Sequence, residues 1–220
     1  MKIDYQSKIN VIGFDLDHTL YQGSKETDRV IQEYIFKKIA THRICSLEEA
    51  KKLFEDHYQE GRGLSGRKTL LALNIPNAGE IIQEALENAD VAQTLTNNPE
   101  IVRILNDLKQ QYHNIDLITG SGKEQSLKKL SALGIPEHFF SHYITDEIAF
   151  KGDGSAYTYW MELYSFPAEA FLYIGDRLEV DHLIPKNLGI ETMLVNVKEK
   201  IPEVSCPQLA DIKEIKSLLL

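Results

Sequence analysis

Two carboxylates that stand two residues apart, Asp15 and Asp17, end the apolar run that begins at Val11. A continuous apolar run of this length favours a strand that is buried on both faces, as in a parallel sheet. Ligands bind beyond the carboxyl ends of such strands. Two carboxylates so close together repel each other unless a cation lies between them. The pair therefore indicates a cation site at which chemistry takes place.

Polar residues also follow the other predicted strands. The sets, in chain order, are Asp15 with Asp17, then Thr119-Gly120-Ser121, then Lys151, and finally Gly175-Asp176 with Asp181. Because the carboxyl ends of parallel strands lie along one edge of a sheet, we expect these side chains to converge from distant parts of the chain.

The elements that position these residues alternate between strands and helices. Strands are predicted at Lys8–Leu16, Ile115–Thr119, His142–Thr145, Phe171–Ile174 and Thr192–Val195, and two of the later helices at Leu178–Lys186 and Gln208–Leu220. Such alternation predicts parallel pairing with right-handed crossovers. The fold class is therefore α/β, with a Rossmann-like core built on a parallel five-stranded sheet.

A long helical stretch separates the first strand from the second. Apolar residues at helical spacing, and a Ser46-Leu-Glu-Glu49 capping box, fill residues 23–95 without an evident strand. We therefore predict a catalytic core of residues 1–22 and 96–220 and an inserted α-helical domain of residues 23–95. The inserted domain contains a glycine-flanked basic loop with Arg62 and Arg67.

Composition excludes several classes of function. The 220 residues carry a formal charge of −9, which disfavours binding to nucleic acid or to an anionic membrane. No apolar run approaches the length of a membrane span, and no secretory signal precedes the first strand, so we expect a cytoplasmic protein. Cys45 and Cys206 lack a metal-type spacing and are interpreted as reduced bystanders.

Four ordered stretches resemble the motifs of the haloacid dehalogenase superfamily of phosphohydrolases. They are F-D-L-D-H-T-L at Phe14, L-I-T-G-S at Leu117, the lysine Lys151, and Y-I-G-D-R-L-E-V-D at Tyr173. The likeness covers the core, and the helical insertion resembles the helical cap domain of that superfamily. The stretches Y-Q-E-G-R-G-L and D-H-T-L-Y are more loosely similar to pyrimidine 5′-nucleotidase-like phosphatases.

The resemblance implies a role for each acidic residue. Asp15 would be the nucleophile that forms an aspartyl-phosphate, and Asp17 the general acid and base. Asp176, one oxygen of Asp15 and the backbone carbonyl of Asp17 would hold Mg²⁺, the implied cofactor. Asp181 would orient a metal-bound water or Lys151.

The resemblance also implies how the phosphoryl group is bound. Thr119, Gly120 and Ser121 would contact its oxygens near a helix N-terminus, and Lys151 would neutralise its charge. Many members carry a proline soon after this lysine, whereas this chain continues Gly152-Asp153-Gly154, and Lys123 is the competing ammonium group. Arg62 and Arg67 either reach a second anionic or sugar group of the substrate or lie in a solvated helix connection.

Together these features predict a Mg²⁺-dependent phosphatase that acts as a monomer or homodimer on a small phosphorylated metabolite. The expected substrate is a nucleotide monophosphate or a sugar or glycolate phosphate. A phosphomutase on the same fold remains an alternative, whereas Asp17 and a metal site disfavour a dehalogenase. A signalling receiver domain and a non-catalytic binding protein on the same fold are the rivals from other classes.

Overall fold

The computed structural model describes residues 5–59 and 64–220, and Arg62 therefore lies outside the described residues. The chain divides into two compact units, one made of Met1–Gly23 and Thr96–Leu220, the other of Ser24–Leu95. We call them the core unit and the helical unit. No helix among the described residues has both the length and the apolar character needed to cross a bilayer.

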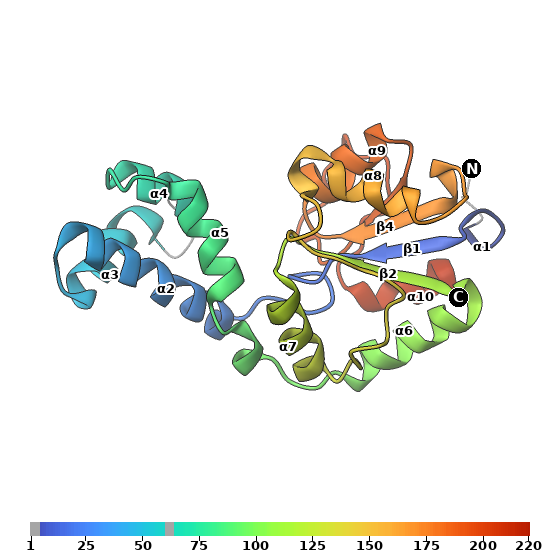
Figure 1. The fold of residues 1–220 in the computed structure, drawn as a ribbon, viewed down its shortest axis with the longest axis horizontal. Coiled ribbons are helices and arrows are strands. Elements are labelled where there is room, and N and C mark those ends of the chain that lie inside the picture. The colour runs from blue at the N-terminus through green and yellow to red at the C-terminus, as the bar shows by residue number, and fades with distance from the viewer. Residues whose placement is uncertain (1–4, 60–63) are drawn as a thin grey trace. The chain divides into compact units, whose positions relative to one another are not determined.

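The core unit is built on a parallel sheet of five strands, as the sequence predicted (Figure 1). The strand order is β3-β2-β1-β4-β5. The strands are β1 (Val11–Phe14), β2 (Asn114–Ile118), β3 (Tyr143–Ile144), β4 (Phe171–Gly175) and β5 (Glu191–Leu194). All the strand pairs are parallel, so the residues that follow the five strands lie along one edge.

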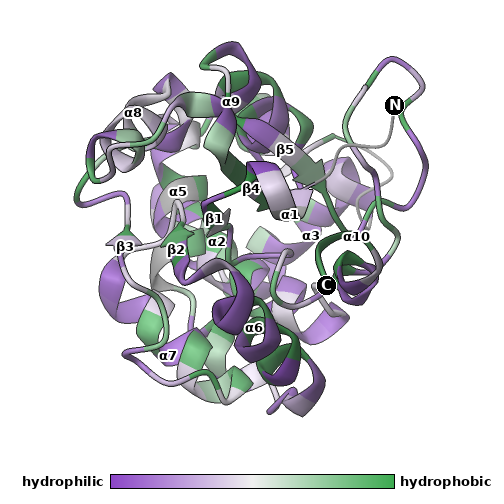
Figure 2. Cartoon of the chain, turned by 90° about the vertical axis from the view of Figure 1, so that its right-hand side faces the viewer, coloured by the Kyte–Doolittle hydropathy of each residue, from purple (hydrophilic) through white to green (hydrophobic). Residues whose placement is uncertain are grey.

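Helices cover both faces of this sheet. Figure 1 shows α6 (Pro99–Tyr112), α7 (Lys123–Leu133) and α10 (Lys216–Leu219) on one face, and α8 (Ser155–Glu162) and α9 (Ile184–Asn187) on the other. Two covered faces explain why β1 and β4 are buried along their whole length and read as continuous apolar runs. Figure 2 shows β1 and β4 in the colour of hydrophobic residues, whereas α6 carries both hydrophilic and hydrophobic residues.

Trp160 on α8 packs directly onto the strand that leads to Asp15. It is fully buried, in edge-to-face contact with Phe171, and its indole N–H donates to Asp116 Oδ2 at 2.8 Å. A Cβ at Gly13 would lie only 2.7 Å from the indole ring, so glycine permits this close approach. Trp160 is thus part of the hydrophobic core of this unit.

The helical unit has a hydrophobic core of its own. Its helices are α2 (Lys25–Arg43), α3 (Leu47–Tyr58), α4 (Gly66–Ala72), α5 (Ala78–Asn88) and the 3₁₀ helix Val91–Thr94. The predicted capping box at Ser46 is present, and Ser24 caps α2 through Thr27 N. Side chains from α2, α3, α4 and α5 form one buried cluster, which includes Ile39, Phe54 and Leu70.

Two predicted elements are wrong in extent. Lys8 does not begin the first strand but ends a short helix, α1 (Tyr5–Lys8), and pairs with Glu191 at 2.6 Å. The helix predicted over Gln208–Leu220 is confined to a 3₁₀ turn, Ile212–Ile215, and α10. The reason is that Gln208 forms a β-bridge with Leu194, and Asp211 then caps the helix through Lys213 N.

The helix after β4 also differs from its expected form. Leu178–Leu183 is π-helical, and the regular helix α9 begins only at Ile184. Single π-helical turns are frequent at functional sites. This one contains Asp181, whose side chain is completely buried.

Candidate active site

Asp15 follows the central strand β1 and is held from both of its oxygens. Its backbone N–H donates to Ile174 O at 2.9 Å, which continues the pairing with β4. The Lys151 ammonium lies 2.7 Å from Oδ1, and the Thr19 hydroxyl donates to Oδ2 at 3.2 Å. The side chain of Asp15 is thus held by polar partners on both oxygens, and the residue is only 3% exposed.

Lys151 bridges two carboxylates that arrive from different strands. Besides Asp15, its ammonium lies 2.6 Å from Asp181 Oδ1, and it stands over the ring of Tyr173 at 5.2 Å. The lysine opens a 3₁₀ turn, Lys151–Asp153, that Asp153 stabilises by accepting from Ser155 N. Burial acts to lower the pKa of Lys151, but the charges of Asp15 and Asp181 outweigh it and raise that pKa.

Asp181 is held by the backbone that follows β4. Its Oδ2 accepts from the N–H groups of Asp176 and Arg177 at 3.2 and 2.9 Å. A Cβ at Gly175 would lie 2.5 Å from the Asp181 side chain, so only glycine leaves room for it. Asp181 thus contacts the Lys151 ammonium through Oδ1 and the backbone after β4 through Oδ2.

Three carboxylates meet beside this lysine. One oxygen from each of Asp15, Asp176 and Asp181 lies within 4.8 Å of the others. Asp176 Oδ1 is buried without a hydrogen-bond partner among the residues that the structure describes. Oxygen donors with one unsatisfied buried acceptor fit a hard divalent cation such as Mg²⁺.

The electrostatics of the cluster favour a bound cation. Burial and the neighbouring charges of Asp15 and Asp181 raise the pKa of Asp176 to about 7. Burial likewise raises the pKa of Asp15, and Lys151 only partly opposes that shift. Carboxylates that resist ionisation in this way are stabilised by a bound cation.

The side chain of Asp17 does not join the cluster but points to a separate set of donors. Its Oδ1 accepts from Lys129 Nζ at 2.7 Å and from the Tyr21 hydroxyl, and its Oδ2 accepts from Ser121 Oγ at 2.6 Å. Burial alone would raise the pKa of Asp17, but the Lys129 charge and these hydrogen bonds hold it below the ordinary value. These donors stabilise the ionised form of the Asp17 side chain, which is not one of the three carboxylates of the cluster.

The loop after β2 presents a hydroxyl and an open backbone position. Thr119 Oγ1 accepts from Ser121 N at 3.1 Å, which leaves its proton free to donate. Around Gly120 a Cβ would meet no atom within 4 Å, so the backbone there faces open space. Ser121 was expected to contact the phosphoryl group, but its hydroxyl donates to Asp17, and Gly122 is the N-cap of α7.

The two lysines that competed for the site are clearly separated. Lys151 contacts Asp15, whereas Lys123 is exposed at the start of α7, where its backbone N–H donates to Glu147 Oε1 at 2.9 Å. Arg67 belongs to the helical unit and is exposed, with its guanidinium about 4 Å from the position of a Cβ on Gly79.

Two residues beside Asp17 were missed by the sequence analysis. Lys129 is 1% exposed, and Tyr21 is also buried. A signal for Lys129 exists, because it stands at helical spacing with Ser126, Leu130 and Leu133, all of them buried. A lysine on the buried stripe of a helix requires a partner.

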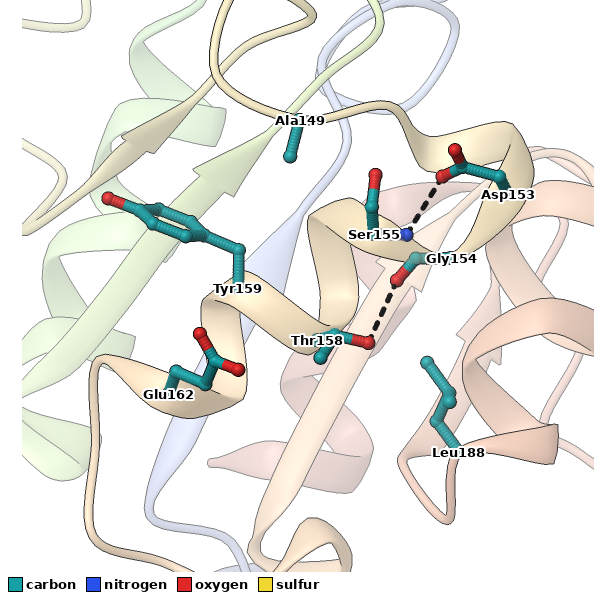
Figure 3. A pocket seen from close by; sticks show the side chains of 8 residues that line it. All are labelled: Ala149, Asp153, Gly154, Ser155, Thr158, Tyr159, Glu162 and Leu188. Carbon is teal, nitrogen blue, oxygen red and sulfur yellow. Dashed lines mark hydrogen bonds between the residues drawn. The ribbon is translucent and has the colours of Figure 1, made fainter.

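A surface cavity of about 510 Å³ lies elsewhere on the core unit, over α8 (Figure 3). Asp153, Thr158, Tyr159 and Glu162 are among the residues that line it. The carboxylates of Asp153 and Glu162 would repel an anionic ligand, and the cluster residues Asp15, Asp176 and Asp181 are not part of its lining. The size of this cavity therefore does not make it the candidate site.

Residues 12–195 match the family described as haloacid dehalogenase-like hydrolase. The chain belongs to this family. The resemblance found in the motifs is thereby confirmed, and the match includes the strand ends that carry Asp15, Thr119, Lys151 and Asp176.

Among curated proteins, the chain is 26% identical over 211 residues to a glyceraldehyde 3-phosphate phosphatase of Methanocaldococcus jannaschii, covering 92% of this chain and 91% of the relative. Among solved structures, an HAD phosphatase from Thermococcus onnurineus has a TM-score of 0.66 at 18% identity, over 96% of this chain and 98% of that one. The putative HAD-hydrolase YfnB from Bacillus subtilis, solved bound to magnesium, has a TM-score of 0.62 at 17% identity, over 96% and 99%. An L-2-haloacid dehalogenase from Xanthobacter autotrophicus shares the fold at a TM-score of 0.57 and 12% identity, over 96% and 98%.

Proposed function

We propose that this hydrolase is a Mg²⁺-dependent phosphatase that cleaves a small phosphomonoester through an aspartyl-phosphate on Asp15. The observation that carries the proposal is Lys151, which bridges Asp15 and Asp181 beside the unsatisfied Oδ1 of Asp176. A carboxylate nucleophile, a fixed ammonium and a cation-binding carboxylate are the groups that phosphoryl transfer requires.

Each residue has a defined task in this mechanism. An Asp15 oxygen forms a bond to phosphorus as the bond to the leaving oxygen breaks, and Asp17 in its protonated form gives a proton to that oxygen. Water then forms a bond to phosphorus, Asp17 accepts its proton, and the bond between phosphorus and Asp15 breaks. Thr119 and the Gly120 N–H donate to the phosphoryl oxygens, and Lys151 neutralises their charge.

Mg²⁺ is the cofactor in this proposal. Asp176, one oxygen of Asp15 and the backbone carbonyl of Asp17 would hold it, and Asp181 positions Lys151 alongside. When bound, it neutralises charge on the transferring group and relieves the repulsion among the carboxylates.

One curated relative supports the choice of substrate class. We propose a small sugar-type phosphate, with glycolate phosphate and nucleotide monophosphates as further candidates and the helical unit as the cap that selects among them. The name of the curated relative, a phosphatase of a three-carbon sugar phosphate, supports the first choice.

The test is phosphate release from a panel of phosphomonoesters with and without Mg²⁺, run beside Asp15→Asn. We expect Mg²⁺-dependent release that Asp15→Asn abolishes. Release that survives in Asp15→Asn would refute Asp15 as the nucleophile. Product analysis in the same reactions separates hydrolysis from phosphoryl transfer to a second sugar hydroxyl.

A further inference from the structure

Two lysines are buried within residues 5–59 and 64–220, and each pairs with a different carboxylate of the first motif. Lys151 pairs with Asp15, as the mechanism requires. Lys129 pairs with Asp17 at 2.7 Å, and the mechanism proposed above gives it no role. A buried ammonium is costly unless it is paired, so its presence there calls for an explanation.

Lys129 fixes Asp17 together with two hydroxyl groups. Its ammonium donates to Asp17 Oδ1 and also to Ser121 Oγ at 3.0 Å, and Ser121 Oγ in turn donates to Asp17 Oδ2. The Tyr21 hydroxyl donates to Oδ1. Both oxygens of Asp17 are therefore held by donors, which restricts the side chain to one rotamer.

The helix that carries Lys129 makes this arrangement rigid. Leu130 and Leu133 of α7 are buried in the core unit, and Gly134 ends the helix in a left-handed conformation. The neighbouring Lys128, by contrast, is exposed and pairs with Glu124 one turn earlier at 2.7 Å. The chain thus offers two adjacent lysines, of which only one reaches Asp17.

We propose that Lys129 is a positioning residue that holds Asp17 as the base for the second half of the reaction. In that step, water forms a bond to phosphorus, the bond to Asp15 breaks, and the proton of the water passes to Asp17. A misplaced base slows this step without affecting the attack of Asp15 on a substrate whose leaving group needs no proton. The inference rests on the proposed phosphatase function.

The test compares wild type, Lys129→Met and Lys128→Met with 4-nitrophenyl phosphate, whose leaving group departs unprotonated. We expect Lys129→Met to lower kcat by about 10- to 100-fold, the range for a misplaced catalytic group. Its KM falls in proportion, so kcat/KM stays near the wild-type value, and a burst of nitrophenol precedes the slow phase. Lys128→Met should match the wild type in all of these measurements.

The second variant is Tyr21→Phe, which removes one hydroxyl and keeps the ring packed. We expect the same pattern from it with a smaller loss of kcat. The positioning role is wrong if Lys129→Met lowers kcat/KM as much as kcat and shows no burst. It is also wrong if the substitution changes neither kcat nor kcat/KM. If Lys129→Met does not fold, the same two outcomes for Tyr21→Phe decide the question. A wild type without phosphatase activity on the whole panel would overturn the proposed function and this inference together.

Discussion

Lys151→Met is the substitution for which the structure predicts the largest combined effect on stability and activity. Methionine has a similar length and no branch, so the change mainly removes the charge. The ammonium lies 2.7 Å from Asp15 and 2.6 Å from Asp181, and all three groups are buried. Removing one partner from a buried ion pair costs about 3–5 kcal/mol, because an uncompensated buried charge remains. Two orphaned carboxylates place this variant in the upper part of that range.

The assay is urea-induced unfolding of wild type and Lys151→Met, each in EDTA and in Mg²⁺. We expect Mg²⁺ to restore part of the lost free energy of unfolding, because a cation near Asp15 and Asp176 offsets the missing ammonium. Under saturating Mg²⁺, kcat for phosphate release should still fall by about 10²–10³-fold, the effect of losing one fixed electrostatic donor.

Lys123→Met is the matched control, since Lys123 is exposed and stands at the start of α7. Exposed substitutions of this kind usually change stability by less than about 0.5 kcal/mol. If Lys151→Met loses less than about 1 kcal/mol, below the range for a broken buried pair, the assignment of a stabilising bridge is refuted. Equal activity losses in the two variants would refute the catalytic assignment.

Two further results are expected. Gly175→Ala should destabilise the protein by about 1–3 kcal/mol and lower kcat, because its Cβ would lie 2.5 Å from Asp181; unchanged unfolding and activity would contradict the tight contact. The raised pKa of Asp176, about 7 against an ordinary 3.8, means that protonation favours the folded state and that this stability is lost as pH rises through about 7. The apparent affinity for Mg²⁺, measured by calorimetry, should therefore rise between pH 5.5 and 8, since the cation competes with that proton; an affinity that is independent of pH would contradict it.

The sheet was predictable because its strands are apolar on both faces and are followed by polar residues. Val11–Phe14 and Phe171–Gly175 stand out for this reason, and parallel pairing then brings Asp15 close to Lys151 and Asp181. The residues of the predicted cluster converge because topology, rather than detailed packing, determines which strand ends share an edge.

The partners of Asp17 were not predictable in the same way. Periodicity treats a lysine as a surface residue, yet Lys129 lies on the buried stripe of α7. Ser121 has the spacing of a helix cap, but Glu147 from another segment satisfies the first N–H of the helix instead, which leaves the serine free to meet Asp17. Side-chain networks of this kind depend on three-dimensional packing, which a single sequence does not encode locally.

Asp116 is a second case of this limit. It is fully buried on β2, where it accepts from Trp160 Nε1, from the Tyr164 hydroxyl and from His142 N. These donors come from α8, from the segment that follows α8 and from the segment before β3. The sequence shows that β2 contains an aspartate, but its apolar pattern does not indicate that Asp116 accepts hydrogen bonds from these three segments.

The position of β1 has a consequence for hydrogen exchange. Val11–Phe14 is paired on both sides, by β2 and β4, and all four residues are buried. Its amides should therefore exchange only through global opening, whereas the helical unit Ser24–Leu95, with its separate hydrophobic cluster, has the means to open as an independent foldon. Asp15 would then directly follow the slowest-exchanging segment of the chain, and opening of the helical unit would leave its contact with Lys151 intact.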